Sequence, residues 1–354
     1  MSDKLLMKGN EALAEAAIIA GCRFFFGYPI TPQTEVAAYM AKRMPKIGGT
    51  FLQSESELAA INMVIGAASA GARAMTSSSS PGVSLKSEGI SFLAAMDIPA
   101  LIINVQRGGP GLGGIQPAQG DYYQATRSIG HGDFHTLVFA PSTVQEVVSL
   151  VIDAFDMADK YRIPAMMLAD GILGQMMEPV SFPEPMRELP PKPWATNGTK
   201  GLRKKNILNS LYLKPDELEE INFIRYQKYA EIEKNEQRYE EFMADDAEYM
   251  IVAFGAAARI AKNAIRAARE KGIKVGLIRP ITLWPFPKDI LMKRAGQVKA
   301  FICAELNMGQ MIDDVRLATE CARPVHLVNR AGGMVFTPEE IIAKIEEVAG
   351  GANK

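Results

Sequence analysis

The sequence has few of the residues that bind metals or form disulfides. Its 354 residues include three cysteines and three histidines. Cys22, Cys303 and Cys321 are scattered and none belongs to a C-x-x-C pair, which argues against a disulfide framework. An iron–sulfur cluster normally takes four thiolates, and the histidines have no zinc-like spacing with the cysteines. If the protein carries out redox chemistry, the metal is expected on another chain.

An excess of charge of one sign and long apolar runs are also missing. The formal net charge is −1, which argues against nucleic-acid binding driven by phosphate contacts. Gly, Ser or charged residues interrupt the apolar stretches before they could span a bilayer. Residues 1–4 lack the basic start and apolar core of a signal peptide. We therefore expect a cytoplasmic protein with neither nucleic acid nor membrane as a partner.

What the sequence does contain is the alternation of an α/β protein. Its hydrophobic content of 48% is typical of a globular protein, and its length suggests two domains. Residues 1–182 alternate between helical and strand patterns, which predicts a mostly parallel sheet with helices on both faces. Residues 57–72 are apolar nearly all round, as in a buried helix, and Ser142 with Gln145 predicts a capping box. The expected helices are 11–20, 33–43, 57–72 and one from Ser142, and the expected strands are 23–26, 51–53, 98–105 and 164–168.

The rest of the chain divides into two segments. Residues 183–245 begin with a proline-rich stretch, which is typically extended and semi-rigid. A long, charged, helix-forming run follows over 215–245, and it reads either as a solvated linker helix or as an arm that packs on a partner subunit. Residues 246–354 predict a second α/β unit, with a helix beginning at Thr337-Pro338. Its expected strands are 249–254, 275–278, 300–304 and 325–328.

Two carboxylates follow the strand that is expected at residues 51–53. Glu55 and Glu57 stand where this strand gives way to the apolar helix. Acidic residues in a first helical turn are commonly explained by the helix dipole alone. The functional alternative is a buried carboxylate that shares a proton with a ring nitrogen, and Glu57 leads straight into the apolar run. The residues alone leave both interpretations open.

Other strand ends carry polar or glycine-rich loops, where open α/β sheets bind ligands. Residues 27–33 form a turn in which Thr31 offers a hydroxyl, or simply caps the next helix together with Pro32. The serine cluster at 76–82 could line a polar ligand site or form a capped loop. Residues 109–114 match G-x-G-x-x-G, but Pro110 lies inside the motif and no helix follows, which argues against a nicotinamide site. Arg107, just before this loop, suits a carboxylate because its fork binds two oxygens.

Taken together, these motifs resemble one family over essentially the whole chain. The combination looks like the alpha-type subunit of 2-oxoacid:ferredoxin oxidoreductases, and closest to subunits for 2-oxoisovalerate or 2-oxoglutarate. The motifs that carry the resemblance are Tyr28-Pro29-Ile30-Thr31-Pro32, Gln53-Ser54-Glu55-Ser56-Glu57, Thr76 to Gly82, Arg107-Gly108-Gly109-Pro110 and Asn307-Met308-Gly309-Gln310.

The resemblance implies a fold and a division of labour. The first domain resembles a thiamine-diphosphate pyrimidine domain, and the second a transketolase C-terminal domain. A beta-type partner is expected to supply the pyrophosphate-binding domain, Mg²⁺ and a 4Fe-4S cluster. Gamma-type and ferredoxin-like delta-type subunits often complete the complex. Asp170-Gly171 followed by Asn197 matches the magnesium motif of such domains only superficially, because a proline-rich segment intervenes.

The family's functional residues carry over to few positions. Glu57 rather than Glu55 matches the activating glutamate. Thr31 matches a residue near the substrate carbonyl or carboxylate, and Arg107 matches the arginine that binds the substrate carboxylate. Tyr28, Pro29, Ile30 and Ser79 are expected to line the cofactor.

The implied reaction is oxidative decarboxylation of a 2-oxoacid. Coenzyme A collects the acyl group and ferredoxin takes the electrons, while thiamine diphosphate supplies the organic chemistry. Two alternatives to this function are a non-catalytic scaffold subunit of the same kind of complex and a NAD-type dehydrogenase.

Overall fold

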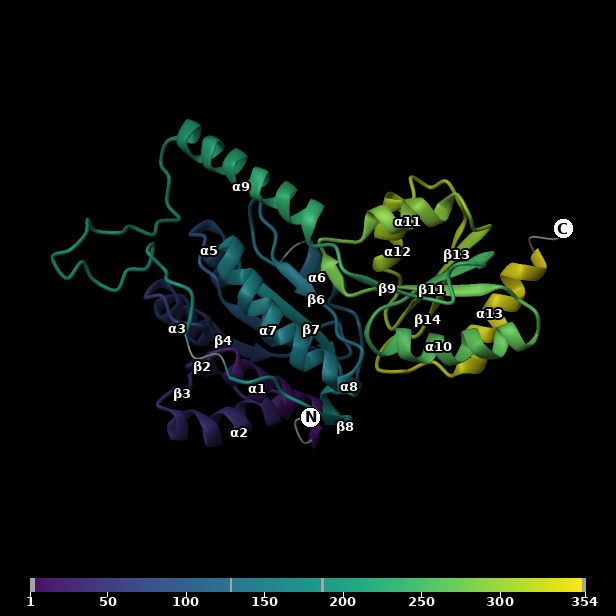
Figure 1. Ribbon diagram of the computed structural model, residues 1–354, viewed down its shortest axis with the longest axis horizontal. Helices are drawn as coiled ribbons and strands as arrows, with labels where there is room; N and C mark the ends of the chain where they lie inside the picture. Colours follow the sequence, from purple (N-terminus) through teal and green to yellow (C-terminus); the bar gives the residue numbers. More distant parts are fainter. Residues whose placement is uncertain (1–3, 128, 186–187, 352–354) are drawn as a thin grey trace.

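A computed structural model describes residues 4–127, 129–185 and 188–351. These residues form two α/β units, each built on its own sheet, and helix α9 (Pro215–Asn235) lies along one side of the first (Figure 1). A separate ribbon pairs β1 (Leu5–Lys8) with β8 (Met177–Val180) in antiparallel fashion. Among the described residues, no helix combines the length and apolar character needed to cross a membrane.

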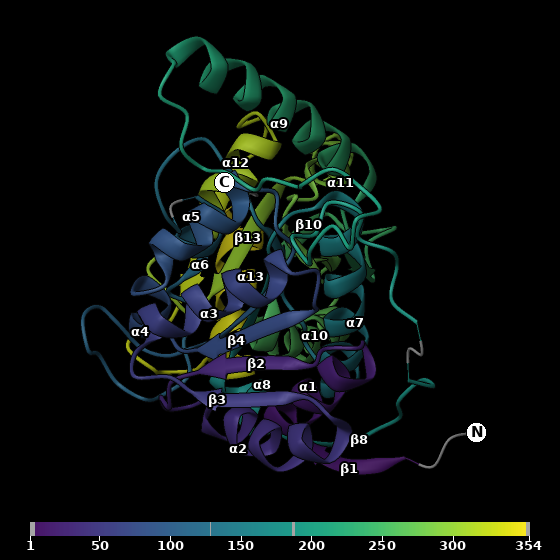
Figure 2. The ribbon, with the colours of Figure 1, turned by 90° about the vertical axis from the view of Figure 1, so that its left-hand side faces the viewer.

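The first sheet has seven strands in the order β12-β6-β7-β5-β4-β2-β3. Every neighbouring pair is parallel except β12 with β6. Figure 2 shows β4, β2 and β3 side by side at one end. The central strands are buried along their whole length, as in a parallel sheet covered on both faces. The strands are β2 (Phe24–Gly27), β3 (Thr50–Gln53), β4 (Ala74–Ser78), β5 (Leu101–Gln106), β6 (Leu137–Phe139), β7 (Ala165–Asp170) and β12 (Thr282–Trp284).

The helices of the first unit fall into two groups. Helix α1 packs on α2 and α7, whereas α3 packs on α5. The helix predicted to begin at Ser142 is capped one residue later, because Thr143 is the last extended residue and its Oγ accepts from Glu146 N at 3.1 Å. The elements are α1 (Gly9–Ile19), α2 (Thr34–Arg43), 3₁₀ helix η1 (Met44–Ile47), α3 (Glu57–Ser69), α4 (Pro81–Ser84), α5 (Ser87–Ala95), α6 (Tyr122–Thr126), α7 (Val144–Tyr161) and α8 (Gly171–Gln175).

Helix α3 is not buried on all sides, contrary to the prediction from its composition. Ile61 and Val64 face the core, but Leu58 is 48% exposed and Met63 is 36% exposed. An apolar pattern does not distinguish burial inside a chain from burial against a second chain. The exposed apolar side of α3 is therefore a candidate subunit contact.

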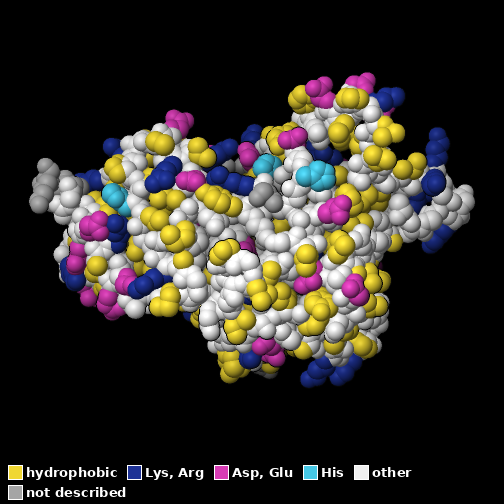
Figure 3. Space-filling model, turned by 180° about the vertical axis from the view of Figure 1, so that it is seen from behind, with side chains coloured by type: hydrophobic (Ala, Val, Ile, Leu, Met, Phe, Trp, Pro, Cys, Tyr) yellow, Lys and Arg dark blue, Asp and Glu magenta, His cyan; other side chains and the backbone are white. Residues whose placement is uncertain are grey.

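The segment between the units is extended at first and then helical. Residues 188–214, here called the arm, contain no helix or strand in the described part of the chain and project from the body. The arm exposes large apolar side chains such as Leu202 and Leu213, and Lys and Arg side chains gather on it (Figure 3). Helix α9 is fixed to the first unit by Arg225, whose Nη2 donates to Ala95 O at 3.0 Å, and by Lys228.

The helix predicted over 215–245 is wrong beyond Asn235. Residues Tyr239–Phe242 form β9, the edge strand of the second sheet, antiparallel to β11 (Val275–Pro280). Its Glu240 pairs with Arg279 and Lys262, so sheet pairing overrides the helix propensity of a glutamate-rich run.

The second sheet has the order β14-β13-β10-β11-β9 and is otherwise parallel. All four strands predicted in this unit are confirmed within one or two residues. The helix start at Thr337 is confirmed as well, since Thr337 N donates to Glu340 Oε2 at 2.9 Å. The remaining elements are β10 (Tyr249–Val252), β13 (Ala300–Glu305), β14 (Val325–Asn329), α10 (Gly255–Glu270), α11 (Lys288–Ala295), α12 (Met311–Ala318) and α13 (Pro338–Gly351).

Candidate active site

The candidate site lies where the carboxyl ends of β2, β3, β4 and β5 meet. These strands are parallel neighbours, so the loops that follow them converge at one edge of the sheet. Ser54, just after β3, is bonded to the end of β2, because both its N and its Oγ donate to Gly27 O at 2.9 and 3.1 Å. The fold thus brings together the polar loops that the sequence placed at separate strand ends.

Glu57 is the first residue of α3 and is 6% exposed, whereas Glu55 is exposed. The helix is capped by Ser56, whose Oγ accepts from Ala59 N at 3.2 Å, so capping does not require the Glu57 side chain. Within the described part of the chain, the Glu57 carboxylate has no hydrogen-bond partner. A buried carboxylate without a partner is costly, so this side chain points to a ligand that donates to it.

The loop after β4 forms a close-fitting wall beside this carboxylate. A Cβ built on Gly82 would lie 2.6 Å from Glu57 Oε1 and 2.2 Å from Ser78 Oγ, so any side chain here would displace both groups. The hydroxyls of Thr76, Ser78 and Ser79 are buried and have no partner among the described residues. The serine cluster is therefore an unsatisfied polar wall next to Glu57.

Thr31 and Arg107 are brought together from separate loops. Arg107 is 6% exposed, and its Nη1 donates to Thr31 O at 3.0 Å while its Nη2 donates to Leu112 O at 2.9 Å. Its Nε is buried without a partner. Thr31 does not cap α2, because that helix begins at Thr34 with Gln33 at the N-cap. The guanidinium thus links the turn after β2 to the glycine-rich loop after β5.

A second polar network adjoins Arg107 and was not found from the sequence. Ser80 Oγ donates to Asp121 Oδ2 at 2.6 Å, and Arg107 N donates to Ser80 Oγ at 3.0 Å. Asn104 Nδ2 also donates to Asp121, at 2.9 Å. Burial raises the pKa of Asp121, opposed by the bonds from Ser80 and Asn104 and by the charge of Arg107. The signals that could have found this network are Asn104 and Gln106, two polar residues in a buried strand whose other residues are apolar.

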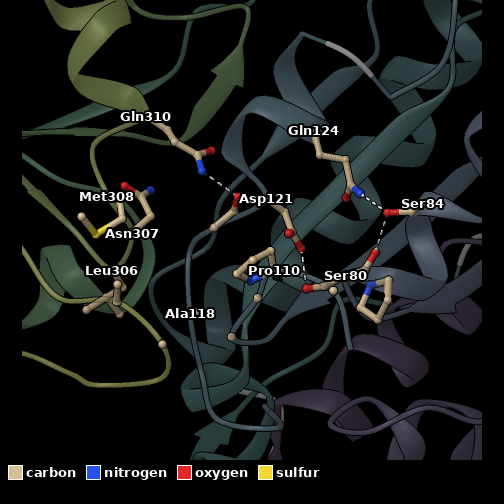
Figure 4. Close-up of a pocket in the computed structure, with 17 residues that line it drawn as sticks. Ser80, Ser84, Pro110, Ala118, Asp121, Gln124, Leu306, Asn307, Met308 and Gln310 are labelled. Carbon is tan, nitrogen blue, oxygen red and sulfur yellow. Dashed lines mark hydrogen bonds between the residues drawn. The ribbon is translucent and has the colours of Figure 1, made fainter. Parts of the chain in front are cut away.

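A cavity of about 380 Å³ opens from this network toward the second unit (Figure 4). On one side it is lined by Ser80, Asp121 and residues 108–111, and on the other by Asn307 and Met308. Hydrogen bonds close its rim across the two units, as where Gln310 Nε2 donates to Gly120 O at 2.8 Å. The motif at residues 307–310, in the second unit, therefore lies in the same region as the motif at residues 107–110, in the first unit.

The remaining motifs serve the framework. Asp170 caps α8 by accepting from Leu173 N, and it also accepts from Ala256 N in the second unit, at 2.9 Å. Asn197 accepts from Arg203. The glycine-rich loop after β5 does not run into a helix, since α6 begins only at Tyr122, which is not the geometry of a dinucleotide fingerprint. Tyr28, Pro29 and Ile30 lie in the turn after β2, at least partly exposed.

Family matches cover most of the chain. Residues 15–250 match the thiamine-diphosphate-binding domain of pyruvate flavodoxin/ferredoxin oxidoreductases. Residues 247–341 match core domain II of pyruvate:ferredoxin oxidoreductase.

Two curated relatives align with nearly the full length. The ketoisovalerate oxidoreductase subunit VorB of Methanothermobacter thermautotrophicus is 51% identical over 98% of both chains. The 2-oxoglutarate synthase subunit KorA of Methanocaldococcus jannaschii is 38% identical over 95% of this chain and 97% of its own.

Solved structures give the same result at the level of the fold. A 2-oxoglutarate:ferredoxin oxidoreductase from Magnetococcus marinus, with 2-oxoglutarate, coenzyme A and succinyl-CoA bound, superposes with a TM-score of 0.90 at 30% identity. It is matched over 98% of this chain and 65% of its own. A split-gene transketolase described as an inactive β4 tetramer has a TM-score of 0.61 at 14% identity, which concerns the fold alone.

Proposed function

The chain belongs to the pyruvate flavodoxin/ferredoxin oxidoreductase family, and from this membership we propose that it supplies the pyrimidine-activating half of a thiamine-diphosphate site. The observation that carries the proposal is Glu57, a buried carboxylate without a hydrogen-bond partner in the described part of the chain. The complex would oxidise a 2-oxoacid with coenzyme A to acyl-CoA, carbon dioxide and reduced ferredoxin.

The residues present fit the pyrimidine end of the cofactor. Glu57 offers an acceptor that needs a donor, and Ser78 and Ser79 offer buried hydroxyls that need partners. Gly82 leaves space against the carboxylate that a side chain would fill. When bound, thiamine diphosphate supplies the carbanion chemistry that removes carbon dioxide from the 2-oxoacid.

Each side chain has a stated task in this proposal. Glu57 holds the proton that it shares with a pyrimidine ring nitrogen, and its low exposure of 6% limits the access of water to that bond. Arg107 binds the substrate carboxylate, with its buried Nε free for a first contact. Thr31, which Arg107 already contacts, orients the substrate next to it. Tyr28, Pro29, Ile30 and Ser79 line the cofactor.

The other half of the site is proposed to belong to partner chains. Among the described residues, no group of three or more His, Cys, Asp or Glu side chains is placed to hold a metal. A beta-type subunit would bring the pyrophosphate-binding domain, Mg²⁺ and a 4Fe-4S cluster, and gamma-type and delta-type subunits would complete the path to ferredoxin. The exposed apolar side of α3, which begins at Glu57, is the surface proposed to meet such a partner.

Among 2-oxoacids, the branched-chain 2-oxoisovalerate is proposed ahead of 2-oxoglutarate. The relative named for ketoisovalerate is 51% identical, compared with 38% for the relative named for 2-oxoglutarate. Turnover of the purified complex with each of the two acids and with pyruvate tests this order. A higher kcat/KM for 2-oxoglutarate would reverse it.

The decisive experiment for the function compares two neighbouring carboxylates in the assembled complex. Glu57→Gln keeps the size of the side chain but cannot share a proton as a carboxylate does, so oxidation should fall by at least about 100-fold, the scale of lost acid–base catalysis. Glu55→Gln alters an exposed side chain two residues away and should leave turnover near normal. Near-normal turnover of Glu57→Gln in an intact complex would refute the assignment.

A further inference from the structure

Lys86 is a buried lysine that the proposed reaction does not yet use. It stands between α4 and α5 with no exposed surface, and its Nζ has no hydrogen-bond partner among the described residues. An ammonium group buried without a partner is strongly disfavoured. Accordingly, burial lowers the pKa of Lys86 to about 8, with the charge of Glu57 acting in the opposite direction.

Two close approaches place the segment that carries Lys86 against the start of α3. Gly82 lies against the Glu57 carboxylate, and a Cβ on Gly89 would lie 2.5 Å from Ile61 Cγ2, one turn further along α3. Residues 82–89 therefore run along the first turns of α3, and Lys86 lies between the two contact points. The two charges interact across the protein interior and not through a direct hydrogen bond.

Glu57 is the charged group that acts on Lys86 within the described part of the chain. Strands β4 and β5 and helix α4, which surround this junction, contain no titratable side chain. Glu88 on α5 is exposed. Asp121 accepts from Ser80, and the Arg107 guanidinium donates to Thr31 O and Leu112 O. Changes at Glu57 should therefore be felt directly at Lys86.

We propose that Lys86 is the internal counter-charge of Glu57 and releases its proton when an aminopyrimidine ring engages that carboxylate. The inference rests on the proposed function. Before the ring binds, the ammonium of Lys86 and the carboxylate of Glu57 compensate each other. When Glu57 shares a proton with a ring nitrogen, that proton would balance the negative charge of the carboxylate. The ammonium of Lys86 would then lose its counter-charge and hold its proton less tightly. One proton arrives between Glu57 and the ring and one leaves Lys86 Nζ, so the total charge of the site is unchanged.

The proton count on cofactor binding tests this proposal. Thiamine diphosphate is titrated calorimetrically into the cofactor-free complex at pH 7, in two buffers of different ionisation enthalpy. The wild-type complex should take up close to no net proton. Lys86→Arg should take up about one, because a guanidinium keeps its proton in proteins. Equal counts for wild type and Lys86→Arg would overturn the proposal.

A second variant covers the case in which arginine does not fit. Lys86→Met removes the charge and keeps an unbranched side chain, so it should bind the cofactor about tenfold more tightly than wild type at pH 6. The two affinities should converge at pH 9, where Lys86 is neutral. A ratio that does not change with pH would overturn the proposal.

The control is Lys192→Met. Lys192 is mostly buried too, but it pairs with Asp159 at 2.6 Å, outside the candidate site. Its affinity ratio to wild type should not change with pH. If the wild-type complex itself does not bind thiamine diphosphate, the proposed function fails. If it binds normally with the same proton count as Lys86→Arg, only the role of Lys86 fails.

Discussion

A methyl group on Gly82 would lie 2.6 Å from Glu57 Oε1, closer than real Cβ contacts come. The same methyl group would lie 2.2 Å from Ser78 Oγ. The loop after β4 and the first turn of α3 are thus fitted to each other at Glu57, whose carboxylate has no hydrogen-bond partner among the described residues. A side chain added at Gly82 would therefore have to push the Glu57 carboxylate and the Ser78 hydroxyl out of their positions.

Gly82→Ala should therefore weaken the cofactor site more than the fold. Overpacking of this kind costs about 1–3 kcal/mol, and a comparable loss in binding lowers thiamine-diphosphate affinity of the complex about tenfold or more. Isothermal titration of the complex measures this affinity. Gly350→Ala is the control, because a Cβ at that helical position meets no atom within 4 Å. Unchanged affinity in Gly82→Ala would show that Glu57 is not held against this loop when the ring binds.

Arg107→Lys should separate substrate binding from cofactor binding. Lysine keeps the charge but loses the planar fork that binds two carboxylate oxygens and reaches Thr31 O and Leu112 O together. Loss of such a charge-assisted pair costs about 1.5–3 kcal/mol, so KM for the 2-oxoacid should rise about tenfold or more. Thiamine-diphosphate affinity should stay within about twofold of wild type, and a large loss there would instead assign Arg107 to the cofactor.

The stability of the cofactor-free chain should depend on Lys86 in a definite direction. Its pKa is lowered in the fold, to about 8 from an ordinary 10.5, so the unfolded chain binds more protons between these two values. The penalty is therefore fully present below pH 8, and stability rises with pH through the window from 8 to 10.5. The stability of wild type relative to Lys86→Met should therefore rise by about 3 kcal/mol between pH 7 and pH 10.5.

Urea unfolding of the two chains at pH 7 and at pH 10 measures this difference. A stability difference that does not change between pH 7 and pH 10 would mean that the pKa of Lys86 is not lowered in the fold.

Individual residues show which features of the fold and of the candidate site could be predicted from the sequence. The strand ends could be predicted because parallel strands alternate with helices. This prediction placed Glu57, Thr31 and Arg107 in one region. Glu57 and Glu55 could not be separated by periodicity, since the helix start alone decides which of them turns inward. The burial of Lys86 could have been predicted as well, because Lys86 lies three residues after Val83 and four before Ile90, on the apolar side of its segment.

Long-range pairing was the part that local patterns could not supply. Strand β12 (Thr282–Trp284) leaves the second unit to pair with β6 in the first, and β9 forms from a run that favours helix on its own. Both outcomes depend on partners more than 30 residues away in the sequence. The exposed side of α3 is a similar case. Its apolar composition predicts burial in the core, but the described part of the chain does not cover it.

The last prediction concerns that side of α3. Leu58→Glu places a charge on a surface that is apolar and 48% exposed, so it should change the stability of the chain alone by no more than about 0.5 kcal/mol. In the complex, the same charge would be buried against a partner without a counter-ion, which costs several kcal/mol. Subunits co-expressed with Leu58→Glu should therefore not co-purify on size exclusion, although the chain remains folded.

Leu317→Glu is the matched control, since Leu317 is 69% exposed on α12 in the second unit. It should assemble as wild type does. Because Leu58 directly follows Glu57, loss of assembly in one variant and not in the other would place the partner at the mouth of the cofactor site. Normal assembly of Leu58→Glu would mean that the second half of the site approaches from elsewhere.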